Sequence, residues 1–241
     1  MVPGNKMVTE IVENNFSKSS KPNKNMFSKL VPSLIRIGTN NLDLSMFSPD
    51  AKYNILSALG EEHRKKGNLH DAAKCFVLAN NKEGLVSVAE DYERLLQFDN
   101  CIEVYSMIKN NDKLIEIGKK CLKETKLKQA AKAFVASNFT DGLRQVANDC
   151  IDHYRFDQAF EVLSIIDDRS RFVEFGNKCL DQEEYSYAVK SFDRANDTEK
   201  LNKVGDLLLR EEYLQQALEA YKLADNKIMV AFIMENYYKK K

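Results

Sequence analysis

The chain has 241 residues, of which 44% are hydrophobic and 30% are charged, a composition typical of a globular protein with a well-buried core. It carries 36 Lys and Arg against 36 Asp and Glu, and this balance argues against a phosphate backbone or an anionic membrane as its partner. A membrane-spanning run and a secretory signal are both missing, and five Cys are too few for a secreted disulfide framework, so we expect a cytoplasmic protein with reduced thiols.

The N-terminal quarter departs from the pattern that follows it. Residues 1–25 are rich in Asn, Ser and Lys and have no periodic apolar face, which predicts a flexible tail, with a basic partner-binding arm as the alternative. Residues 26–50 match the later repeat only in part, because Pro32 and Pro49 interrupt it. We interpret this segment as a degenerate repeat that caps the N-terminal end. Ser48 and Pro49 suit the N-cap and first turn of the next helix.

Residues 51–241 repeat every 29 positions. Each copy has a large apolar residue in one column, a small residue in a second and mostly an aromatic residue in a third. The columns are Leu56, Leu85, Leu114, Leu143, Phe172 and Leu201; Gly60, Ala89, Gly118, Ala147, Gly176 and Gly205; and Phe76, Tyr105, Phe134, Leu163, Phe192 and Tyr221. Within a copy the apolar positions follow the i, i+3, i+4, i+7 spacing of two amphipathic helices, the first and second helix of a hairpin.

One hairpin cannot bury its own apolar stripe, so neighbouring hairpins must stack. We therefore predict an all-α fold, a right-handed α-solenoid of six 29-residue helical hairpins followed by a C-terminal capping helix from about Lys227 to Tyr238. Polar residues near the helix starts are predicted N-caps: Asn111, Thr140 and Thr198 for first helices, and Asp99, Asp157 and Ser186 for second helices.

A longer period is superposed on the first. One column of the second helices alternates in sign through Lys74, Glu103, Lys132, Glu161, Lys190 and Glu219, which suggests that the true unit is a pair of hairpins. One hypothesis is a ladder of charge pairs that fixes the register of successive helices. The other is a solvated face whose alternation reflects duplication of this two-hairpin unit.

We find no pattern that predicts catalysis or a cofactor. Cys121, Cys150 and Cys179 share one column, but equivalent helices about 8–10 Å apart are too distant for a disulfide, and we expect buried, inert thiols. The histidines, His63, His70 and His153, have no partner at metal-ligand spacing, so we interpret them as surface or turn residues. Phosphate-binding and nucleophile motifs are also missing. The sequence thus predicts a protein that is not an enzyme and has no cofactor and no metal.

The columns of large, small, aromatic and alanine residues resemble tetratricopeptide repeats, although the repeat of that family is longer than the one in this chain. The stretch from Leu59 to Phe76 is similar to the helical repeats of coatomer and intraflagellar-transport scaffolds. These resemblances cover residues 55–238 and imply a helical-repeat scaffold that holds partners.

The function predicted from this fold is protein–protein interaction with a partner helix or peptide on the solenoid surface. An exposed column of the first helices runs from basic to acidic to basic and is the candidate partner-binding surface: Lys65, Arg94, Lys123, Asp152, Asp181 and Arg210. The alternatives are nucleic-acid binding, which the charge balance disfavours, and self-assembly as a subunit of a larger complex.

Overall fold

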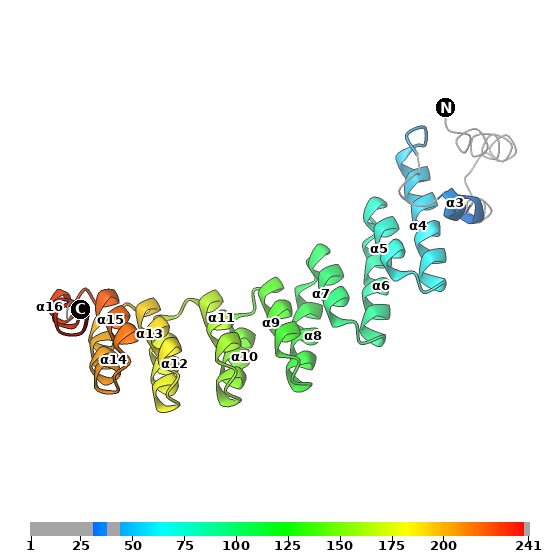
Figure 1. Cartoon of the computed structure of the whole chain (residues 1–241). Coiled ribbons are helices and arrows are strands. Elements are labelled where there is room, and N and C mark those ends of the chain that lie inside the picture. The colour runs from blue at the N-terminus through cyan, green and yellow to red at the C-terminus, as the bar shows by residue number, and fades with distance from the viewer. Residues whose placement is uncertain (1–30, 38–43, 239–241) are drawn as a thin grey trace, which may run out of the picture. The chain divides into compact units, whose positions relative to one another are not determined.

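The computed structural model describes residues 31–37 and 44–238, and within these ranges it contains fourteen α-helices, α3 to α16, and no strand (Figure 1). The predicted all-α class is therefore confirmed, and so is the series of six hairpins with one further helix. The predicted tail, residues 1–25, lies outside the described residues, as do 26–30 and 38–43 of the predicted N-terminal cap.

Each hairpin pairs a long first helix with a shorter second helix. The first helices are α4 (Pro49–Lys65), α6 (Lys82–Arg94), α8 (Asn111–Lys123), α10 (Thr140–Asp152), α12 (Arg169–Asp181) and α14 (Thr198–Arg210). The second helices are α5 (Leu69–Leu78), α7 (Phe98–Met107), α9 (Leu127–Ala136), α11 (Phe156–Ile166), α13 (Tyr185–Arg194) and α15 (Leu214–Leu223). Before them lies α3 (Val31–Ile37), and after them α16 (Lys227–Ile233) continues into a π-helical turn over Met234–Tyr238.

The turns between helices recur with the same period as the helices. Each contains one residue with a left-handed backbone: Gly67, Leu96, Thr125, Tyr154, Glu183 and Glu212 inside the hairpins, and Asn80, Lys109, Asn138, Asp167, Asn196 and Asp225 between them. In the first hairpin the amide of Asn68 donates to the carbonyl of His63 (2.9 Å), the bond with which a left-handed residue closes a helix end. Turns of this kind end one helix and start the next within a few residues.

Ser48 is the N-cap of α4, as predicted, since its Oγ accepts from the amide of Ala51 (3.3 Å). The other predicted N-caps are wrong. Asn111, Thr140 and Thr198 are the first residues of α8, α10 and α14, and Asp99, Asp157 and Ser186 are the second residues of α7, α11 and α13. The side chains that cap α6, α8, α12, α14 and α16 belong to the preceding column: Asn81, Asn110, Asp168, Asp197 and Asn226. That column follows the left-handed residue directly, and the backbone is extended at Asn81 and Asp168, as a cap requires.

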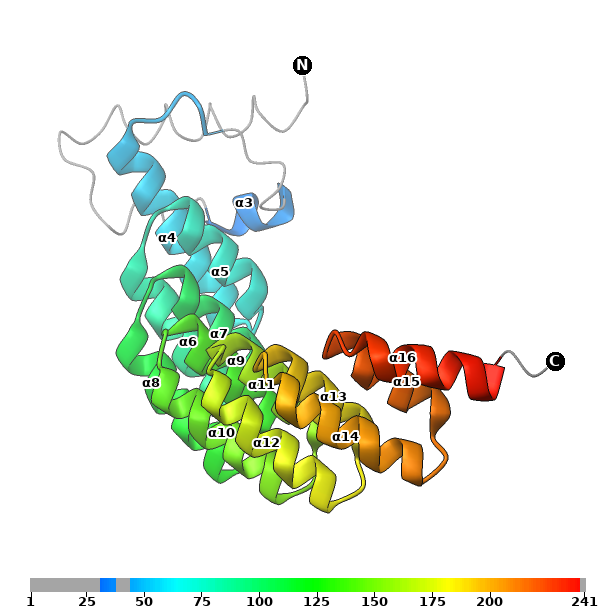
Figure 2. The ribbon, with the colours of Figure 1, turned by 90° about the vertical axis from the view of Figure 1, so that its left-hand side faces the viewer.

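The helices form two compact units, and the boundary between Ile117 and Gly118 falls inside α8. Within unit 2 the first helices α10, α12 and α14 lie in one layer and the second helices α11 and α13 in another (Figure 2). Polar bonds join neighbouring first helices in the same register in both units. Asn81 Nδ2 donates to Ser57 Oγ (3.0 Å), and five repeats later Asn226 Nδ2 donates to Asn202 Oδ1 (2.6 Å).

The small-residue column makes room for the aromatic column. A Cβ atom on Gly60 would lie 2.7 Å from the Phe76 ring, and one on Gly84 would lie 2.4 Å from it, so the ring fits between two glycines of successive first helices. Phe134 fits in the same way between Gly118 and Gly142. These two arrangements are two repeats apart, so the longer period suggested by the charges also exists in the core.

Both ends of the described chain pack on their neighbours. Val31 and Leu34 of α3 belong to a buried cluster with Ile55, Leu59 and Cys75, while the role of residues 26–50 as a degenerate capping repeat stays a prediction. At the other end α16 packs on α15 and buries Ile233. Across the described residues, no helix has both the length and the apolar character needed to cross a membrane.

Candidate protein-docking grooves

Two grooves lie between second helices, one in each compact unit. Groove 1 separates α5 from α7 and has a volume of about 410 Å³. Groove 2 separates α9 from α11 and has a volume of about 570 Å³. Each residue that lines groove 1 has its counterpart two repeats later in groove 2. The same kind of groove therefore occurs in two copies of the two-hairpin unit.

The floor of each groove is apolar and buried. Tyr92 from α6 and Val104 from α7 form it in groove 1, and Cys150 from α10 and Val162 from α11 form it in groove 2. Burial raises the pKa of the Cys150 thiol to about 11, so this thiol is a poor nucleophile at neutral pH. The floor offers packing surface rather than chemistry.

Large apolar side chains stand exposed on the rims. Val77 and Met107 face groove 1 with exposures of 50% and 55%, and Val135 and Ile165 occupy the same places in groove 2 with exposures of 41% and 54%. Leu78, also on groove 1, is 64% exposed. Scattered exposed apolar residues are normal, but here they gather along an apolar groove and recur in register, which is the signature of an interaction surface.

Each groove has a basic wall and an acidic wall. Lys74 of α5 and Glu103 of α7 line groove 1, and Lys132 of α9 and Glu161 of α11 line groove 2. Lys74 forms an ion pair with Asp71 of its own helix (3.8 Å). Among the described residues, neither Glu103 nor Glu161 has a hydrogen-bond or ion-pair partner. The alternating charge column thus lines the two grooves, while its role as a ladder that fixes register stays a prediction.

The junction between α11 and α13 has an aromatic ring in a column that holds amides beside the two grooves. Between α11 and α13, the Tyr187 ring packs against Phe156 and Phe160, with ring centroids 6.2 and 6.3 Å apart. Asn100 and Gln158 occupy the equivalent column in α7 and α11, beside the grooves. At this junction a ring occupies the space beside α11 that an amide side chain occupies in the two grooves.

The third copy of the unit is charged on one side of the rim, whereas Leu223 keeps an exposed apolar side chain (40%) at the position of Met107 and Ile165. Asp193 stands in α13 where Val77 and Val135 stand in the grooves, and Arg194 occupies the position of Leu78. Arg194 donates to Asp167 Oδ1 (2.9 Å) and its guanidinium lies 5.6 Å from the centroid of the Phe172 ring. The α13 helix thus shows that this fold accepts charged residues at the rim positions.

The predicted column lies elsewhere, in the last turn of the first helices. Its members, Lys65, Arg94, Lys123, Asp152, Asp181 and Arg210, are all exposed, as the sequence predicts. Three have partners within 4 Å: Lys65 with Glu62 (3.2 Å), Arg94 with Asp91, and Asp152 with Lys178 (3.2 Å). As a partner-binding surface the column stays a prediction.

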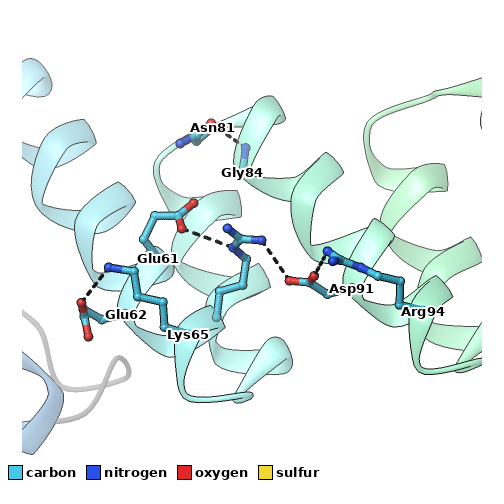
Figure 3. Close-up of polar contacts among 8 residues, drawn as sticks. Glu61, Glu62, Lys65, Asn81, Gly84, Asp91 and Arg94 are labelled. Atoms are coloured by element: carbon cyan, nitrogen blue, oxygen red, sulfur yellow. Dashed lines mark hydrogen bonds and ion pairs between the residues drawn. The ribbon is translucent and has the colours of Figure 1, made fainter.

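The polar network in the first hairpins explains part of this column (Figure 3). Arg64 donates to Glu61 Oε2 (3.2 Å) and to Asp91 Oδ2 (3.1 Å) and so joins α4 to α6. Asp91 also binds Arg94. Arg94 therefore belongs to an ion-pair network that holds neighbouring first helices together, in which each exposed pair contributes about 0.2–1 kcal/mol.

The structure corrects one interpretation of the histidines and supports that of the cysteines. His63 is buried, with 6% exposure, and neither ring nitrogen has a hydrogen-bond partner, so its interpretation as a surface or turn residue is wrong. It occupies the column of Tyr92 and Cys150, which faces the core. All five cysteines are buried. In residues 31–37 and 44–238, no three His, Cys, Asp or Glu side chains gather as a metal site.

Comparisons with known proteins add little to this geometry. No protein-family model and no curated protein matches the chain. Among solved structures, the crystal structure of a tetratricopeptide repeat protein from Parabacteroides merdae is similar, with 14% sequence identity and a TM-score of 0.27 over 95% of this chain and 98% of that one.

Proposed function

We propose that this chain is a non-enzymatic protein-interaction scaffold, cytoplasmic as its sequence predicts, and that its two grooves hold helical segments of partner proteins. The observation that carries the proposal is the recurrence of one open, apolar-rimmed groove in both compact units. Exposed apolar area of this kind is costly to leave in water, at about 25 cal/mol per Å², and a partner would remove it from water.

A helix fits such a groove better than an extended peptide. The walls are helices whose backbone groups are already paired within the helix, so they offer an extended chain no backbone partners. A helix satisfies its own backbone and needs only an apolar stripe against the floor. Two neighbouring helices with a groove between them can also receive a third by ordinary ridge-into-groove packing.

The two alternative functions have weaker support. Nucleic acid would bring phosphates next to the unpaired carboxylates of Glu103 and Glu161, and the chain has no net positive charge to compensate. Self-assembly is compatible with the grooves if a second copy supplies the docking helix. Light scattering over a range of protein concentrations separates this case, because self-association makes the mass rise with concentration.

We expect the chain to bind a synthetic amphipathic helix saturably. The probe, called here the mixed-edge peptide, carries a leucine stripe with glutamate along one edge and lysine along the other. A dissociation constant between about 10 μM and 1 mM is expected, because the buried area is below that of a standard protein interface. Fluorescence anisotropy of the labelled peptide measures it, and a scrambled peptide of the same composition serves as control. Equal signals from the two peptides would contradict the proposal.

A further inference from the structure

The charged walls add information about what the grooves hold. Lys74 and Lys132 lie on the wall formed by the earlier helix of each pair, α5 and α9. Glu103 and Glu161 lie on the wall formed by the later helix, α7 and α11. The sign of each wall is therefore the same in both grooves, although the two sites belong to different compact units.

The acidic walls are the more informative. Glu103 and Glu161 are exposed and lack ionic partners among the described residues, whereas many other acidic residues of the chain are paired along their own helix. A carboxylate beside an apolar groove gains most from a cation that arrives with the ligand, because the ligand also displaces water from the pair. A matching acidic edge would meet Lys74 or Lys132.

The length of the walls sets the size of the bound segment. In groove 1 the α5 wall extends from His70 to Leu78, which corresponds to roughly 12 Å of helix at about 1.5 Å per residue. A docked helix therefore contacts the groove over about two turns, enough for an apolar stripe of two or three side chains and one or two charges on each side.

We infer that both grooves select the same ligand: an amphipathic helix whose aliphatic stripe has basic residues along one edge, facing α7 or α11, and acidic residues along the other, facing α5 or α9. This inference rests on the proposed function, and it deepens it by stating the chemistry of the partner. Because reversing a helix exchanges its edges, the walls also decide the direction in which the helix lies.

Three peptides with the same leucine stripe test this selection. One is the mixed-edge peptide, one has lysine along both edges, and one has glutamate along both edges. The mixed-edge peptide is expected to bind about five- to tenfold more tightly than either same-sign peptide at low salt, with the preference fading as salt rises. Equal affinities for all three peptides would overturn the inference.

Reversing the charge of the acidic walls should change which peptide binds most tightly. In the Glu103→Lys/Glu161→Lys variant both walls of both grooves are basic, so the glutamate-edged peptide becomes the tightest ligand. Glu219→Lys is the matched control, since it makes the same charge change in the same column on α15, and Glu219 lines neither groove. The control should keep the wild-type preference.

The outcomes separate the two proposals. If none of the three peptides binds the wild-type chain, the grooves are not helix-docking sites and the proposed function fails. If all three peptides bind but the charge-reversed variant ranks their affinities as the wild-type chain does, the grooves are docking sites and the proposed charge selection is wrong. A shift of preference in the double variant and not in Glu219→Lys supports both.

Discussion

Replacing Gly60 with leucine is expected to destabilise unit 1 by about 3 kcal/mol. A Cβ at Gly60 would lie 2.7 Å from the Phe76 ring, and the ring has no room to retreat, because a Cβ on Gly84 at its other side would lie only 2.4 Å away. Leucine forms helices better than glycine by about 0.8 kcal/mol, so any loss must come from overlap in the core. Urea unfolding followed by circular dichroism measures the change.

The natural repeats supply the control for this experiment. Alanine occurs in the same column at Ala89 and Ala147, and leucine replaces the aromatic residue at Leu163. Adding Phe76→Leu to the Gly60→Leu variant should therefore recover part of the lost stability, since the smaller side chain relieves the overlap. A single variant as stable as the wild-type chain would show that the glycine column does not set the helix spacing.

The buried thiols are expected to react more than 100-fold more slowly in the folded chain than in the unfolded chain at pH 8. Burial raises the pKa of Cys75 and Cys150 to about 11 and that of Cys179 to about 12. A thiol with a pKa of 11 is only about 0.1% thiolate at pH 8, against roughly a quarter for an ordinary thiol, and burial also blocks access. Absorbance with a disulfide reagent, with and without urea, measures both rates.

The same pKa shifts predict a loss of stability in alkali. Unfolded thiols lose their protons near pH 8.5–9 while the folded thiols keep theirs, so stability is full below that range and falls as pH rises toward 11. Each thiol contributes a slope of about 1.4 kcal/mol per pH unit within this window. Cys150→Ala should reduce this slope by about 1.4 kcal/mol per pH unit, the contribution of one thiol. Two results would contradict the burial of these thiols: labelling of the folded chain as fast as labelling in urea, or a free energy of unfolding that does not change between pH 9 and 11.

Most of the fold is predictable from the period of the repeat, because buried columns tolerate few residue types. Gly60 and Phe76 recur as small and aromatic residues for a reason visible in the core: each ring needs the space that a missing side chain leaves. The predicted N-caps are wrong because the helices begin earlier than the sequence suggests. Turn residues such as Tyr154 and Glu183 adopt left-handed backbones, and without a glycine at these positions the sequence does not show where the turn lies. The prediction for His63 is wrong because a polar residue in a core column looks like a surface residue.

The grooves escape prediction for a different reason. The alternating charges and the recurring Val77 and Val135 are visible in the sequence, but an apolar residue on the outer face of a helix can pack against the next hairpin as well as against a partner. Which of the two occurs depends on side chains of the next repeat, as the Tyr187 ring shows by packing against Phe156 and Phe160 of the preceding second helix. The periodicity of apolar residues within one helix does not show whether such a residue packs against the next hairpin or stays exposed.

The number of mixed-edge peptides bound per chain tests the central claim most directly. Isothermal titration calorimetry should give two sites for the wild-type chain, one for Val77→Asp, one for Val135→Asp and none for the double variant. These variants should fold, because α13 carries Asp193 at the same position. Correctly folded variants that bind as many peptides as the wild-type chain would contradict the claim that the two grooves are the docking sites.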